Sequence, residues 1–171
     1  KFSMMACQHI TKFAGVEVYE TDNHFLAQSS LDGALTASSA LRGLAVNMQK
    51  IANDIRFLGS GPRAGIGELA LPAVQPGSSI MPGKVNPVIP EAVIQASSQV
   101  LACDTALVQG AQGGYFELNT MMPFVAHNLL QAISLLSNSS EIFVEKYLIR
   151  RGMSDTLSLR DWMLISKTFS L

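Results

Sequence analysis

Apolar residues recur at steps of three and four along three stretches of the chain. Such spacing places the apolar side chains on one face of an α-helix, and the alternation is typical of helices that pack at shallow angles. The pattern therefore predicts an all-α fold, a bundle of long helices. The repeating positions are Leu41, Leu44, Met48, Ile51, Ile55 and Leu58, then Ile89, Val93, Ala96, Val100, Cys103 and Leu107, and finally Met122, Val125, Leu129, Ala132, Leu136 and Phe143.

Glycines and the apolar stripe set the limits of the third helix. Gly113 and Gly114 separate it from the helix before it. We expect it to begin near Leu118 or Asn119 and to end by Leu148. A helix of twenty or more residues is a rod of about 30 Å or longer.

The first forty residues have a less regular pattern. A short helix is expected from Met5 to Phe13, and it stops at Gly15. The residues from Val16 to Tyr19 alternate as in a strand but are interpreted as a connector. Asp22 and Asn23 suit the cap of a further short turn.

The segment from Gly59 to Pro87 is rich in glycine and proline and has no long periodicity. A loop of nearly thirty residues between two long helices exceeds what a connection needs, and loops of that length are usually functional. Candidate chemistry is therefore expected here.

The end of this loop reads Gly77-Ser78-Ser79-Ile80-Met81-Pro82-Gly83-Lys84-Val85-Asn86-Pro87. Glycines beside a serine pair allow a sharp turn that presents backbone N–H groups. Pro87 suits the start of the following helix, whose N-terminus adds positive partial charge. This suits an anionic ligand or a transition state in which negative charge grows. From spacing alone, a flexible connector with a solvated Lys84 is an equal alternative.

Composition narrows the classes of function. Of the 171 residues, 48% are hydrophobic and 15% are charged, which is typical of a folded protein. A formal net charge of -1 gives no basic surface for nucleic acid, and no window approaches the about 18 apolar residues of a membrane span. We expect neither a nucleic-acid nor a membrane partner, and we expect the apolar excess to lie between helices or between subunits.

Cysteine and histidine usage is unremarkable for metal binding or disulfides. Cys7 and Cys103 lie far apart in sequence and form no disulfide framework. They are interpreted as buried thiols in a reducing compartment, the cytoplasm or the mitochondrial matrix. The three histidines, His9, His24 and His127, have no metal-site spacing. No metal and no cofactor is therefore predicted.

The eleven residues from Gly77 to Pro87 resemble the signature loop of the fumarase/aspartase superfamily. Three further segments also resemble the class II fumarases of that superfamily: Lys50 to Arg63, Gly67 to Pro72 and Tyr115 to Asn119. The resemblance implies the long-helix bundle of the family's central domain, with a long catalytic loop, over about residues 1–148. Residues 149–171 do not resemble the family and form a divergent tail.

The choice within the superfamily depends on few residues. Gly83 before Lys84 resembles fumarases, and so does the segment from Phe116 to Asn119. The segment from Val88 to Glu91 resembles aspartases as well. The resemblance thus implies a lyase that hydrates fumarate to L-malate in the tricarboxylic acid cycle, with aspartate ammonia-lyase as the alternative.

The resemblance also implies roles for the loop residues. Ser78 would take the proton from the substrate carbon next to a carboxylate, and Glu91 would orient a histidine that handles water. Free serine is too weak a base at neutral pH, so its alkoxide needs stabilisation by neighbouring amides and cations. Binding of the substrate carboxylate would fall to Ser79, Lys84, Val85 and Asn86.

The histidine-bearing segments of the family normally precede the stretch present here. The start at Lys1 resembles neither a signal peptide nor a transit sequence, and we expect it to be the middle of a longer protein. In the family, the central helices form a homotetramer, and each active site combines segments of three subunits. The isolated chain is therefore expected to be inactive. A truncated, non-catalytic helical oligomerisation fragment is the third interpretation.

Overall fold

The structure is a computed structural model that describes residues 1–61, 63–77, 79–81 and 83–148. The predicted tail, 149–171, lies outside the described residues. The described part is helical and contains no β-sheet, so the predicted all-α class is confirmed. Its helices are α1 (Phe2–Ala14), α2 (His24–Ser29), α3 (Asp32–Leu58), α4 (Val88–Ala111) and α5 (Met122–Phe143), and a π-helical segment follows at Val144–Leu148.

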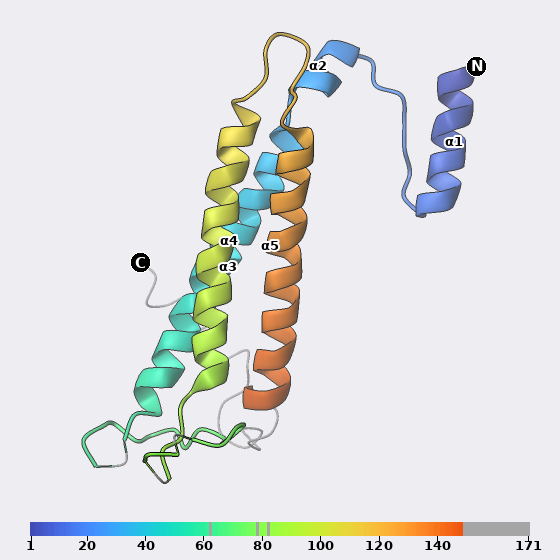
Figure 1. Ribbon diagram of the computed structural model, residues 1–171. Helices are drawn as coiled ribbons and strands as arrows, with labels where there is room; N and C mark the ends of the chain where they lie inside the picture. The colour runs from blue at the N-terminus through green and yellow to red at the C-terminus, as the bar shows by residue number, and fades with distance from the viewer. Residues whose placement is uncertain (62, 78, 82, 149–171) are drawn as a thin grey trace.

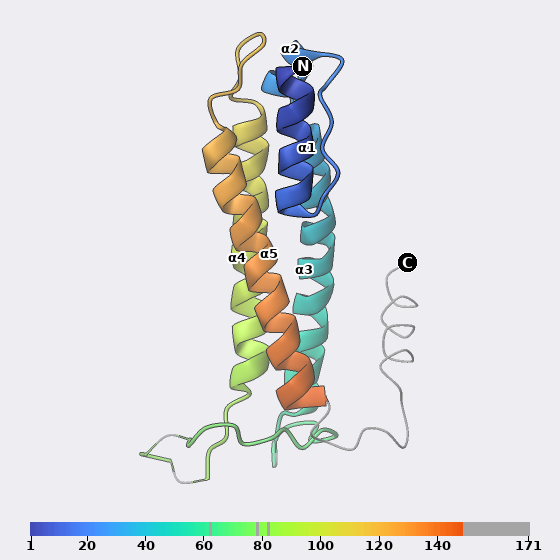
Figure 2. The same cartoon turned by 90° about the vertical axis from the view of Figure 1, so that its right-hand side faces the viewer.

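Three long helices run side by side and form the body of the molecule (Figures 1 and 2). Helix α4 packs against α3 and against α5 along its length, whereas α3 and α5 contact each other less. The 27 residues of α3 make a rod of about 40 Å. Helix α1 buries none of its residues, and Figure 1 shows it beside the bundle rather than within it. None of the helices in the described ranges has the length and apolarity needed to cross a membrane.

The predicted apolar stripes face one another and form the core. One expected core position, Leu44, instead has 48% of its surface exposed, because the next residue, Ala45, takes the contact position and is fully buried. A small residue there lets α3 and α4 approach closely. The buried core of the described residues consists of Ala45, Met48, Ala52 and Ile55 from α3, Val93, Val100, Cys103 and Leu107 from α4, and Val125, Ala132, Leu136 and Phe143 from α5.

The short N-terminal elements follow their local signals. Helix α1 ends at Gly15, which has a left-handed backbone (φ 67°) and donates its N–H to the Thr11 carbonyl. Asn23 caps α2, and its side-chain oxygen accepts the Leu26 N–H at 3.1 Å. Both signals depend on residues within one turn, which is why the sequence reveals them.

The predicted start of the third helix near Leu118 or Asn119 is wrong, because α5 begins at Met122. Tyr115 and Leu118 exchange backbone hydrogen bonds of 3.0 and 3.1 Å, which closes a tight turn. Buried Asn119 then donates its side-chain N–H to the Gly110 carbonyl at 3.0 Å and accepts the Met121 N–H at 2.8 Å. The side chain ties the end of α4 to the start of α5, so the helix cannot begin earlier.

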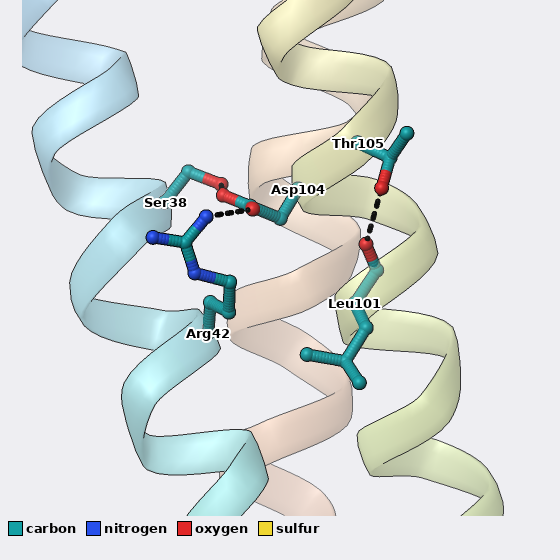
Figure 3. Close-up of polar contacts among 5 residues, drawn as sticks. All are labelled: Ser38, Arg42, Leu101, Asp104 and Thr105. Carbon is teal, nitrogen blue, oxygen red and sulfur yellow. Dashed lines mark hydrogen bonds and ion pairs between the residues drawn. The ribbon is translucent and has the colours of Figure 1, made fainter.

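A buried carboxylate joins α3 to α4 near the same end of the bundle (Figure 3). Asp104 accepts a hydrogen bond from the Ser38 hydroxyl at 2.6 Å and from Arg42 Nη1 at 2.8 Å. The Asp104 side chain is 6% exposed, while that of Arg42 is 50% exposed. The carboxylate is therefore paired on both oxygens, and the arginine keeps part of its hydration.

Removing this carboxylate is expected to destabilise the bundle. Asp104→Ala leaves the buried Ser38 hydroxyl without its acceptor and Arg42 without its counter-charge, which should lower the free energy of unfolding by about 2 kcal/mol. Thr105→Ala is the matched control, because Thr105 is exposed on the same turn and its hydroxyl bonds only to the Leu101 carbonyl (Figure 3). That variant should change stability by less than about 0.5 kcal/mol. Urea unfolding measures both, and equal losses would contradict a special role for Asp104.

Candidate active site

The long loop leaves and re-enters the bundle at one end. Helix α3 ends at Leu58 and α4 begins at Val88, and because the two helices are antiparallel neighbours, both ends of the loop lie together (Figure 1). The turn between α4 and α5 lies at the opposite end of the bundle (Figure 1). The predicted loop of residues 59–87 is thus held at its base by helix packing.

The first half of the loop folds back onto the end of α3. The Ser60 hydroxyl donates to the Phe57 carbonyl at 2.6 Å, and the Ser60 carbonyl accepts the Gly67 N–H at 2.6 Å. The Leu69 N–H then donates to the Leu58 carbonyl at 3.1 Å. Leu69 and Leu71 pack against the buried core. This half of the loop therefore caps the end of the bundle.

The second half of the loop closes on itself between Gly77 and Lys84. A Cβ added at Gly77 would overlap the Lys84 carbonyl, so only glycine permits this approach. The Lys84 N–H donates to the Met81 carbonyl at 3.1 Å, and Gly83 has φ 81°, as at the third position of a type II turn. The Lys84 amide is therefore used within the turn, while its side chain stays outside it.

The structure places the predicted binding residues along one short stretch before α4. Ser79, Lys84 and Val85 are exposed and Asn86 is half-buried. Within the described ranges, no carboxylate lies within ion-pair distance of Lys84. Its charge is therefore available to an anion, next to the positive end of α4. Ser78 lies outside the described residues.

Glu91 lies in the first turn of α4 and pairs with a residue that the sequence did not single out. Its Oε1 atom is 3.5 Å from Nη2 of Arg56, in the last turn of α3. Arg56 belongs to the segment from Lys50 to Arg63 that resembles class II fumarases, and it directly precedes the loop. These two features of the sequence could have marked Arg56 as a candidate site residue.

Two surface grooves of the described residues lie away from this stretch. One surface groove lies between α1 and the connector after it, and a smaller one lies between α4 and α5. Neither is lined by Ser79, Lys84, Val85 or Asn86. No group of three or more His, Cys, Asp or Glu side chains gathers among the residues that the structure describes. The loop alone is thus an open surface that could form one wall of a larger site.

Comparison with known proteins identifies the family to which the chain belongs. A model of a family described as "Lyase" matches residues 1–102 of the chain. The chain belongs to this lyase family, which agrees with its helical fold and with the position of its loop.

The relatives within that family carry more particular names. The chain is 52% identical over 130 residues to the class II fumarate hydratase of Mycobacterium tuberculosis, which covers 76% of this chain and 27% of the relative. It is 47% identical over 146 residues to the fumarate hydratase class II 2 of Pseudomonas aeruginosa, covering 85% and 32%. The chain thus spans about a quarter to a third of the length of these curated relatives. The resemblance to class II fumarases is confirmed.

Solved structures show the same fold. A fumarate lyase:delta crystallin from Brucella melitensis superposes with a TM-score of 0.81 at 42% identity, covering 85% of this chain and 34% of that one. A class II fumarase from Schistosoma mansoni gives a TM-score of 0.80 at 32% identity, again with 85% and 34%.

Closure of the loop at Gly77 can be tested on the chain itself. Gly77→Ala should force the Lys84 backbone away and raise the rate of tryptic cleavage after Lys84 severalfold, because the turn can no longer close. Gly33→Ala is the matched control, since a Cβ at Gly33 meets no atom within 4 Å. Mass spectrometry of the fragments follows cleavage, and equal rates in both variants would show that the close approach does not hold the turn.

Proposed function

We propose that the protein is a fumarate hydratase, which catalyses the reversible hydration of fumarate to L-malate in the tricarboxylic acid cycle. The observation that carries this proposal is the eleven-residue sequence 77–87, in which Gly77 closely approaches Lys84 just before α4. It occurs in a chain 52% identical to a class II fumarate hydratase. We also propose that residues 1–148 belong to one central helical domain and that 149–171 are a separate tail.

The proposed chemistry is removal of a proton from the carbon next to a carboxylate. Ser78 acts as the base, and the negative charge that develops spreads onto that carboxylate. Lys84 and Asn86 bind the carboxylate, with Ser79 and the Val85 backbone beside them. Lys84 is exposed and has no carboxylate within ion-pair distance among the described residues, which supports this assignment because a fixed cation stabilises charge that grows during reaction. No cofactor takes part in the proposal.

We propose that the complete site forms between subunits of a homotetramer. The exposure of Ser79, Lys84 and Val85 supports this, because a dicarboxylate bound there needs further walls to enclose it. Apolar side chains on the outer surface of the bundle support it too: Leu130 of α5 is 65% exposed, and Ile133 lies beside it. The free thiols of Cys7 and Cys103 agree with a reducing compartment, such as the cytoplasm or the mitochondrial matrix.

Aspartate ammonia-lyase is not favoured, since the curated relatives described above are named fumarate hydratases. A non-catalytic oligomerisation fragment predicts association without turnover. Turnover by a complete enzyme that carries this loop would distinguish the proposed hydratase from such a fragment.

Ser78 is tested in a chimera, the Pseudomonas aeruginosa relative with its matching segment replaced by the 146 aligned residues of this chain. The unsubstituted chimera should convert malate to fumarate, measured by ultraviolet absorbance. Ser78→Ala should lower kcat by about a thousandfold and leave KM nearly unchanged, because a base is lost rather than an anion contact.

The control is Ser98→Ala, a serine on the exposed side of α4 whose hydroxyl bonds to the Ile94 carbonyl. It should retain full turnover. Near-normal turnover of the Ser78 variant would remove that residue from its role, and an inactive unsubstituted chimera would count against the hydratase. The 171-residue chain alone should show no turnover, and measurable conversion would overturn the composite site.

Self-association is predicted from the exposed apolar side chains of the bundle. The chain should sediment as a tetramer at micromolar concentration, because α5 exposes Leu130 and Ile133 on its outer surface. Leu130→Lys should shift the population toward smaller species. Thr105→Lys adds the same charge at an exposed polar position of a different helix, α4, and should not. A well-folded monomer at all concentrations would refute the tetramer.

A further inference from the structure

The Arg56–Glu91 ion pair joins the two helix ends between which the long loop extends. Arg56 lies in the last turn of α3 and Glu91 in the first turn of α4, with Nη2 and Oε1 3.5 Å apart. Their side chains are 41% and 38% exposed. Water therefore reaches both groups, so the contact adds little to stability. Its more informative effect is on the direction in which the Glu91 carboxylate points.

Both partners are placed where the helices favour their charge. The carboxylate of Glu91 lies at the positive N-terminal end of α4, and the guanidinium of Arg56 lies at the negative C-terminal end of α3. A glutamate in a first turn has several rotamers of similar energy. A cation across the gap favours those that point toward α3 and the base of the loop.

We propose that Arg56 is a positioning residue for Glu91, an inference that rests on the proposed hydratase function. Arg56 holds one carboxylate oxygen, Oε1, and leaves the other for the histidine that Glu91 orients if its role follows the resemblance to class II fumarases. Arg56 does not touch the substrate. Its loss should therefore misplace the general acid–base machinery and lower kcat, while leaving ground-state binding of the dicarboxylate, and so KM, nearly unchanged.

A purely structural clamp between the two helices predicts something else. It would lower stability when either partner is removed, but it would not separate kcat from KM. Lys50 offers a matched control, because it forms an ion pair with Asp54 within the same helix at similar exposure. Lys50→Gln removes a cation from α3 and leaves Glu91 paired.

The pairing is tested first in the 171-residue chain by a double-mutant cycle. Arg56→Gln and Glu91→Gln should each lower the folding equilibrium constant about twofold to fivefold, measured by urea unfolding. The double variant should lose no more than one single variant, because both remove the same contact. Strictly additive losses would show that the two side chains are not coupled and would overturn the proposal.

The catalytic consequence is tested in the chimera described above. Arg56→Gln should lower kcat about tenfold with KM within about twofold. Arg56→Lys should recover most of the loss because it keeps the charge, and Lys50→Gln should match the unsubstituted chimera. A rise in KM at constant kcat, or an equal loss from Lys50→Gln, would overturn the positioning role. An inactive unsubstituted chimera counts against the proposed function instead, and the double-mutant cycle then decides whether Arg56 holds Glu91.

Discussion

The packing of α4 between α3 and α5 is the constraint on which the rest of the structure depends. Small residues such as Ala45 and Ala52 let α3 approach α4 closely, and Val93 and Val100 fill the space between them. Apolar contacts alone tolerate slippage, since a shift by one turn, about 5.4 Å, brings similar side chains together. Polar contacts at each end remove that freedom, because their hydrogen bonds form in one register only.

The two ends of the α3–α4 pair differ in what their polar contacts do. At the end near the α4–α5 turn, the carboxylate of Asp104 is buried and satisfied by Ser38 and Arg42, which makes that register costly to change. At the loop end, Arg56 and Glu91 meet in the presence of water. The accessible pair agrees with the role proposed for Glu91, whereas the buried pair holds the two helices in one register.

The loop gains its geometry from this arrangement. Because its two ends are held together by the helices, about thirty residues can fold back, with Leu71 packed beside Gly59 and Gly77 against Lys84. The result is an exposed turn that carries a cation just before the start of a helix. Ser79, Lys84 and Val85 are exposed on one chain, and the proposed assembly through the apolar outer surface of the bundle would bring other turns and other segments alongside.

The sequence by itself determined the elements whose cause is local. Helical periodicity, the left-handed end at Gly15, the Asn23 cap and the glycine- and proline-rich loop all follow from residues within a turn or two of one another. The proposed chemistry follows from the resemblance of residues 77–87 to the signature loop of the fumarase/aspartase superfamily. The spacing of the residues alone did not indicate it. Only the tertiary structure decided that Leu44 is exposed, that Asn119 delays the start of α5, that Ser38 meets Asp104 and that Arg56 faces Glu91. The partners in α3 and α4 are separated by dozens of residues in sequence, and which of them meet depends on the register that close packing of the helices selects.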